Sequence, residues 1–194
     1  LSAQLNNVIA EADCDNCAET VGVYASNARL IANNVTATAE KSGSAIGIRV
    51  ESSSDVNISN STAYGIEATQ NYGISVSSGS SATVNDITAT GASTTGQPSY
   101  GIEVAGTVNA ISTLNAFNTK AVGEAGPAGV GAVVDGNGTT ASFTNSVLDG
   151  ESLNSGKSIW LVEDGAAKVV NTRFEPRSVD ASDDLTCLNT YYLD

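Results

Sequence analysis

The sequence predicts an all-β fold, a single-stranded right-handed parallel β-helix, which is a solenoid of about six coils. Two patterns that repeat in step predict it: an Asn or Asp at the end of short strand-like segments, and a Gly flanked by apolar residues. The composition agrees, because only 15% of the residues are charged and short polar side chains suit the outer faces of such coils.

The first pattern is a row of Asx residues, each at the fifth position of a segment such as Val56-Asn57-Ile58-Ser59-Asn60. Neighbouring members are 26 residues apart, except between positions 86 and 145, where one more coil fits. At a bend, an Asx side chain tolerates left-handed backbone and can bond its copy one coil away, roughly 4.8 Å along the axis. The predicted ladder is Asn34, Asn60, Asp86, Thr113, Asn145 and Asn171.

The second pattern is a Gly-containing strand such as Ile46-Gly47-Ile48-Arg49-Val50. Its alternation of apolar and other residues predicts a half-buried strand, with like side chains stacked between coils. The Gly is expected to face outward, or to lie at a bend where a Cβ would crowd the backbone. The copies begin at Val21, Ile46, Tyr72, Tyr100 and Val130, with a degraded sixth copy at Ile159.

Three regions follow from these patterns: residues 1–20, the solenoid at 21–174, and a tail at 175–194. The spacing of Leu1, Leu5 and Val8 predicts a short N-terminal helix over residues 1–12. That helix is expected to cap one end of the solenoid; the alternative is the end of a coiled coil through which chains oligomerise. The tail is expected to lay its apolar residues over the other end.

The three cysteines predict one local disulfide. Two residues separate Cys14 from Cys17, no βαβ pattern surrounds them, and the chain has no His, which disfavours redox and zinc roles. We therefore expect a Cys14–Cys17 disulfide in an extracytoplasmic setting. Cys187 follows the last coil, roughly 24 Å away at the coil spacing, and is expected to be free or to pair between chains.

Charge and composition exclude several partners. The net charge of −13 disfavours nucleic acid, whose binding depends on neutralising phosphates. The chain has no apolar run of membrane length, so no membrane insertion is expected. Without His, the commonest general base and metal ligand is missing, and no cofactor is expected. The chain lacks Met, which indicates a processed or trimmed product, and we expect an extracellular or cell-surface bacterial protein.

Over roughly residues 21–174 the Gly strands and the Asx row resemble right-handed parallel β-helix proteins of the pectate-lyase-like superfamily. The stretch Leu185-Thr186-Cys187-Leu188-Asn189-Thr190-Tyr191-Tyr192 resembles the ends of uncharacterised secreted bacterial β-helix proteins. The superfamily resemblance implies that polysaccharide lyases and hydrolases must be considered. A lyase would hold calcium with several carboxylates beside an Arg or Lys base, and a hydrolase would carry Asp residues on neighbouring coils.

The sequence offers little for either enzyme. Glu51 and Glu103 are expected about 10 Å apart, too far for one calcium ion, whose ligands lie about 2.3–2.6 Å from the metal. Asp135 and Asp164 form the one acidic pair that the predicted register places on adjacent coils, and they are a candidate cation site. A solvated end of the solenoid is the more common reason for such a pair.

The sequence therefore favours a non-catalytic extracellular β-helix module, structural or adhesive, with a polysaccharide or cell-surface glycan as its partner. A glycan would bind in a groove between the long loops 91–99 and 123–129, or on the flat polar face before the Asx row. The alternative is a polysaccharide lyase or hydrolase with a diverged acidic site.

Overall fold

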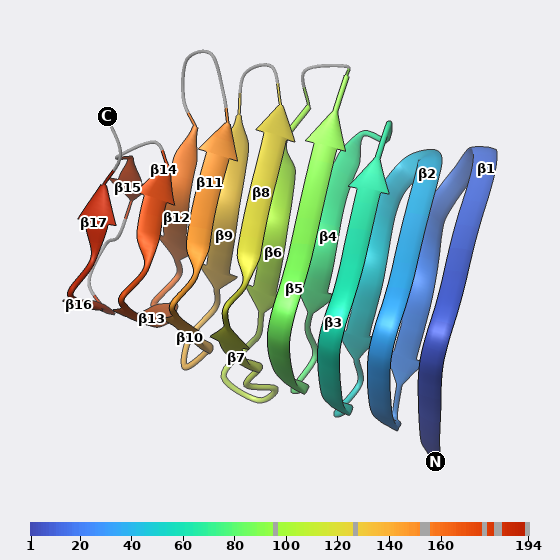
Figure 1. The fold of residues 1–194 in the computed structure, drawn as a ribbon, viewed down its shortest axis with the longest axis horizontal. Coiled ribbons are helices and arrows are strands. Elements are labelled where there is room, and N and C mark those ends of the chain that lie inside the picture. Colours follow the sequence, from blue (N-terminus) through green and yellow to red (C-terminus); the bar gives the residue numbers. More distant parts are fainter. Residues whose placement is uncertain (95–96, 126–127, 152–155, 176–177, 181–183, 193–194) are drawn as a thin grey trace.

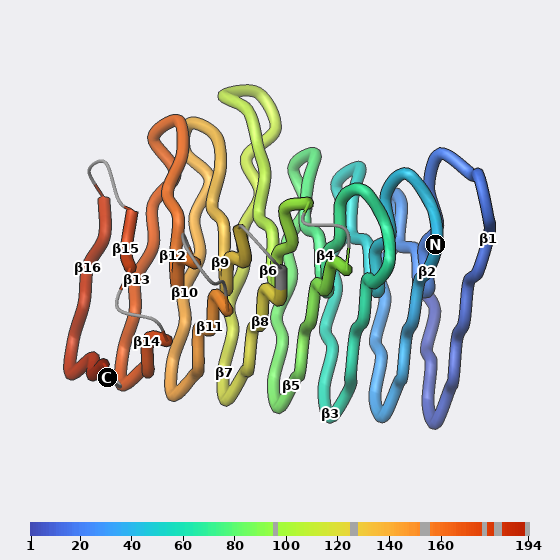
Figure 2. Tube along the Cα trace, turned by 90° about the horizontal axis from the view of Figure 1, so that it is seen from above, coloured from blue at the N-terminus to red at the C-terminus, as the bar shows by residue number. Residues whose placement is uncertain are grey.

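The coils of this protein have three sides, because each repeat supplies a strand before the Asx bend, a strand after it and the Gly strand that returns to the start. The computed structural model is a parallel β-solenoid of about six coils, stacked along one axis with the termini at opposite ends (Figure 1; Figure 2). It describes residues 1–94, 97–125, 128–151, 156–175, 178–180 and 184–192. All pairings between the named strands are parallel.

The early strands run around more than one side, whereas the later strands form one side each. β1 (Ser2–Ser26) and β2 (Arg29–Glu51) follow almost a whole coil, and β3 (Asp55–Ile66) and β5 (Ser81–Ser93) each span two sides. We call the strands before the bend the first side: β7 (Thr113–Phe117), β10 (Thr140–Thr144), β13 (Ala166–Val170) and β16 (Asp184–Leu188). The second side, after the bend, holds β8 (Lys120–Ala125), β11 (Val147–Glu151), β14 (Arg173–Glu175) and β17 (Tyr191–Tyr192). The third side holds β4 (Gln70–Val76), β6 (Ser99–Ala105), β9 (Gly129–Asp135), β12 (Lys157–Val162) and β15 (Val179–Asp180).

The core is a set of apolar rows that run along the axis. On the third side Ile48, Ile74 and Ile102 stack in register and are fully buried. A Cβ at Gly73 would clash with the backbone nitrogen of Thr90 on the facing second side. The two sides therefore pack backbone to backbone at the Gly row. Of the two reasons that the sequence suggests for Gly at this position, an outward face or a crowded backbone, the structure shows the crowded backbone.

The bend between the first and second sides is left-handed in every coil. At this bend lie eight Asx residues with φ between 47° and 55°: Asn7, Asn34, Asn60, Asp86, Asn118, Asn145, Asn171 and Asn189. Thr113, which the sequence reading placed in this row, lies instead at the start of β7, opposite Ser81 and Thr140. The segment 106–112 is an insertion that lengthens this coil, so the bend comes later than a constant period predicts, and Asn118 is the member of the row.

The predicted N-terminal helix is wrong, because residues 2–26 form β1, the first coil, and no described residue is helical. Leu5 pairs with Ala32 and Val8 with Val35, so both face the core although they are three positions apart in the sequence. The left-handed bend at Asn7 takes one residue out of the strand alternation and thereby imitates a helical spacing. Because residues 2–26 are not helical, oligomers cannot form through an N-terminal helix. None of the described segments contains a helix able to span a membrane.

The C-terminal residues prolong the solenoid instead of folding over its end as a separate tail. β15 pairs with β12, β16 with β13 and β17 with β14, each as a further parallel strand. Of the four apolar residues predicted to cover the end, Leu185 is partly buried against the core, and the ring of Tyr192 lies 5.5 Å from that of Phe174. The other two, Leu188 and Tyr191, are 51% and 52% exposed.

Candidate functional site

The acidic pair predicted to bind a cation does not share a row. Asp135 at the end of β9 pairs with Val162, and Asp164 lies two residues further on, in a left-handed turn with Glu163. The sequence predicts that the sixth Gly strand begins at Ile159, but Ile159 pairs with Ala132 and Lys157 with Val130. The strand therefore begins two residues earlier, with Ser158 at the Gly position. Among the described residues no group of three or more acidic, Cys or His side chains is placed to hold a metal.

Two of the three cysteines form a disulfide within the first coil. Cys14 and Cys17 form a disulfide with their Cα atoms 5.6 Å apart, at a break in the register between β1 and β2. Cys187 is free and exposed on β16, at the other end of the solenoid. It lies above Val169, in a row that faces the core in the preceding coils.

The outer face of the third side carries an ionic network. The guanidinium of Arg49 pairs with Glu19 and, at 2.8 Å, with Glu51, which also accepts a hydrogen bond from Tyr24. In the coils above, Ser75 donates to Glu103 at 2.7 Å, and burial raises the pKa of Glu103. These groups are one another's partners, which ties successive coils together and leaves them little to offer a ligand.

An acidic patch lies on the second side and was missed by the sequence reading. Glu124 pairs with Glu151 on the next coil, and Asp149 with Glu175 on the coil after it. Asp149 is only 3% exposed, and its burial, together with the nearby charge of Glu151 and Glu175, raises its pKa to about 6. The repeated Gly-Glu at 123–124 and 150–151 was the signal that could have aligned these acids.

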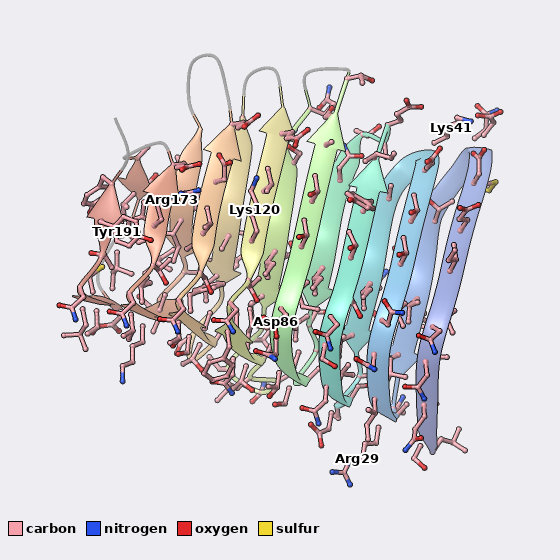
Figure 3. All side chains as sticks on the ribbon, viewed as in Figure 1. Arg29, Lys41, Asp86, Lys120, Arg173 and Tyr191 are labelled. Atoms are coloured by element: carbon pink, nitrogen blue, oxygen red, sulfur yellow. A yellow bond between two sulfur atoms is a disulfide. The ribbon has the colours of Figure 1, made fainter. Side chains whose placement is uncertain are left out.

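Two cations border this acidic patch. Arg173 pairs with Glu175 through Nε at 2.6 Å, and Lys120 lies opposite Val147 in the neighbouring strand. Figure 3 places both cations on the second side, over β14 and β8. The electrostatic effect of Lys120 lowers the pKa of Asp149 but is outweighed by burial and by the surrounding acids.

A groove of about 540 Å³ crosses the outer face of the first side. It spans the four strands β7, β10, β13 and β16, at the lower edge of the solenoid in Figure 1. Its polar lining is mostly hydroxyl and amide, with one ammonium and one carboxylate: Thr113, Asn115, Thr140, Ser142, Lys168, Asp184 and Thr186. The sequence reading recognised this face as flat and polar but not as hollowed. Parts of the two loops predicted to wall a groove, residues 95–96 and 126–127, lie outside the described residues.

Four lining residues form one row across the coils. Asn115 pairs with Ser142, Ser142 with Lys168, and Lys168 with Thr186, so each coil contributes one side chain. We call this set the polar row. In the part of the chain that the structure describes, none of its four members donates or accepts a side-chain hydrogen bond or forms an ion pair. Their hydrogen-bonding groups are therefore open to a ligand.

No family model, no curated protein and no solved structure matches this chain. The case for a function therefore rests on the geometry of its own surfaces.

Proposed function

We propose that this chain is a non-catalytic extracellular β-solenoid module, structural or adhesive in role, that binds a polysaccharide or cell-surface glycan in the first-side groove. One observation carries the proposal: a groove of about 540 Å³ on four coils, with hydroxyl and amide groups that bond no other part of the described chain. Small-molecule sites are concave and largely pre-formed, with a few placed polar groups that orient the ligand, and the hydroxyl groups of a sugar would bond such groups.

The rigid scaffold supports a binding role. The groove lies on strands and not on loops, so its side chains are held in fixed positions by the core rows beneath them, such as Leu114, Ala141 and Ala167. A site built on strands keeps its geometry better than one built on loops. Little ordering is then needed when a ligand binds, which favours affinity.

The same proposal includes an extracellular location for the protein and kinship with a known superfamily. The disulfide between Cys14 and Cys17 suits an oxidising compartment, such as the bacterial cell surface. The repeated Gly strands and left-handed Asx bends support a right-handed coil and kinship with pectate-lyase-like β-helix proteins.

A glycan array followed by isothermal titration tests the binding function. Asn115→Ala and Thr186→Ala, two changes in the polar row, should each weaken binding several-fold by removing hydrogen bonds to the glycan. Asn57→Ala is the matched control, since it removes an exposed amide from the same row outside the groove. Absence of binding to every glycan, or equal loss in the control, contradicts the proposal.

The acidic patch favours a second candidate, a polysaccharide lyase or hydrolase with a diverged acidic site. A carboxyl with a pKa of about 6, such as Asp149, is protonated in part near neutral pH, as a general acid must be. A reducing-sugar assay on neutral and acidic polysaccharides separates the candidates. Product formation that Asp149→Asn abolishes would establish the enzyme and overturn the non-catalytic module.

A further inference from the structure

The first side changes its chemistry halfway along the solenoid. One outward row, next to the polar row, passes through eight strand positions in register. Its first half is polar and its second half is mostly apolar: Asn6, Asn33, Ser59 and Asn85, then Phe117, Thr144, Val170 and Leu188. We call the second half the apolar strip. The switch occurs at β7, where the groove begins.

The side chains of the two halves also differ in hydrogen bonding and in exposure to solvent. In the polar half, Ser59 donates to Asn33 at 3.1 Å, and Asn85 donates to Asp86 at 2.7 Å. In the apolar strip, Phe117 is 40% exposed and Leu188 is 51% exposed. Exposed apolar side chains in a line beside unpaired polar ones mark an interaction surface better than either does alone.

An inserted hairpin lies beside the same switch. Residues 106–112 precede β7, and Thr107 and Ala110 exchange two backbone hydrogen bonds of 3.2 and 2.9 Å. The hairpin carries two further exposed aliphatic residues, Val108 at 64% and Ile111 at 50%. In repeat proteins, insertions concentrate on the face that binds. The insertion and the apolar strip therefore point to one functional region on the coils that contain β7, β10, β13 and β16.

The charge of the region favours an uncharged ligand. The groove contains one cation and one anion, Lys168 and Asp184, in a chain whose net charge is −13. A polyanion would meet long-range repulsion with no excess of positive charge in the groove to offset it. A neutral ligand meets no such barrier.

The spacing favours a polysaccharide over a peptide. Successive members of each row are one coil apart, about 4.8 Å, whereas an extended peptide places side chains on one face every two residues, about 6.6 Å. A peptide along the axis would be out of step after about two coils. One pyranose ring of an extended chain is similar in length to the coil spacing of about 4.8 Å. It also has an apolar face and polar edges, which match the strip and the row.

Resting on the proposed function, we infer that the ligand is a neutral, extended polysaccharide that lies along the solenoid axis across β7, β10, β13 and β16. Its ring faces pack on the apolar strip, with Phe117 as the aromatic platform. Its hydroxyl groups bond the polar row, about one ring for each coil.

Calorimetric titration with neutral β-linked gluco-, manno- and xylo-oligosaccharides of two to six rings tests this arrangement. Affinity should rise with each ring up to about four, because four coils carry both rows. Phe117→Ala should weaken binding about threefold to tenfold, the usual range for losing one stacking partner, while Phe117→Tyr retains it. Ser59→Ala, in the polar half of the same row, should leave affinity unchanged.

The outcomes separate the inference from the function on which it rests. If an oligosaccharide binds but Phe117→Ala matches the wild type, or affinity ignores chain length, the arrangement is wrong and the binding function stands. Tighter binding of polyuronates at equal salt also overturns the arrangement. If no oligosaccharide or polyuronate binds, the proposed function itself fails. Circular dichroism of each variant verifies that the exposed Phe117 can be replaced without loss of the fold.

Discussion

Asn34 donates a hydrogen bond from Nδ2 to Oδ1 of Asn7, one coil earlier, at 2.7 Å. Both residues have left-handed backbone, with φ of 53° and 54°. Near the other end Asn171 donates to Asn145 in the same way, at 3.3 Å. The left-handed bend is common to the whole row, whereas the side-chain ladder joins only some of its members. Backbone geometry is therefore the primary reason for Asx at this position.

Asn60→Leu should destabilise the fold by about 2–3 kcal/mol. Asn60 has φ of 47° and donates to Oδ1 of Asn33 at 2.9 Å. Left-handed backbone costs a residue with a Cβ roughly 1–2 kcal/mol, and the lost hydrogen bond adds roughly 1 kcal/mol. Urea unfolding measures the change. Asn60→Gly is the control, because Gly adopts the bend freely and should lose less; equal losses would contradict the role of the backbone.

Ile74→Ala should destabilise the fold by roughly 2–5 kcal/mol through a cavity in the middle of the solenoid. Ile74 is fully buried between Ile48 and Ile102 in the third-side row. Asn57→Ala, on the exposed outer face, should change stability by less than about 0.5 kcal/mol. Thermal and urea unfolding of both variants test the register, and similar small effects would show that the inward and outward faces are exchanged.

The repeat could be read from the sequence because each row holds like residues at a fixed step. Asn34, Asn60 and Asp86 needed only a constant period to be aligned, and the structure gives all three a left-handed φ. The constant spacing of the Asx residues is interrupted by the hairpin 106–112, because an inserted loop adds residues that are not part of the repeat. A constant period therefore predicts Thr113 at the bend, whereas the structure has Asn118 there.

The bend also misled the reading of the first coil. Leu5 and Val8 both face the core because Asn7 interrupts the alternation between them, and a spacing of three is also the helical one. Periodicity alone cannot separate the two over twelve residues. The groove could not be predicted from the sequence for a different reason. The polar row could be aligned in the sequence, but whether a polar face is flat or hollow depends on tertiary structure.

Native protein should contain one reactive thiol, Cys187, and one disulfide, Cys14–Cys17. Ellman's reagent should titrate one thiol in each folded chain, since Cys187 is exposed, and none in Cys187→Ser. Peptide mapping without reduction should recover residues 14 and 17 in a linked form. A peptide that joins Cys187 to either N-terminal cysteine of the same chain would contradict the structure, because these residues lie at opposite ends of the solenoid (Figure 1).

Asp149→Asn should stabilise the fold at neutral pH, and its advantage over the wild type should grow as pH rises from about 4 to about 6. Burial and the neighbouring Glu151 and Glu175 raise the pKa of Asp149 from 3.8 to about 6. In that window the unfolded chain has lost this proton while the native chain still holds it, so folding becomes less favourable as pH rises. Above about pH 6 both states are ionised and the penalty stays constant.

Urea midpoints of the wild type and Asp149→Asn between pH 4 and 8 test this sign. Asparagine keeps the shape of the side chain and cannot ionise, so the difference between the two proteins isolates the carboxylate. Glu11→Gln is the matched control, because Glu11 begins the same outward row on the first coil and is exposed there. An advantage of Asp149→Asn that is equal at pH 4 and pH 7, or that is matched by Glu11→Gln, would show that burial among acids does not govern this carboxylate.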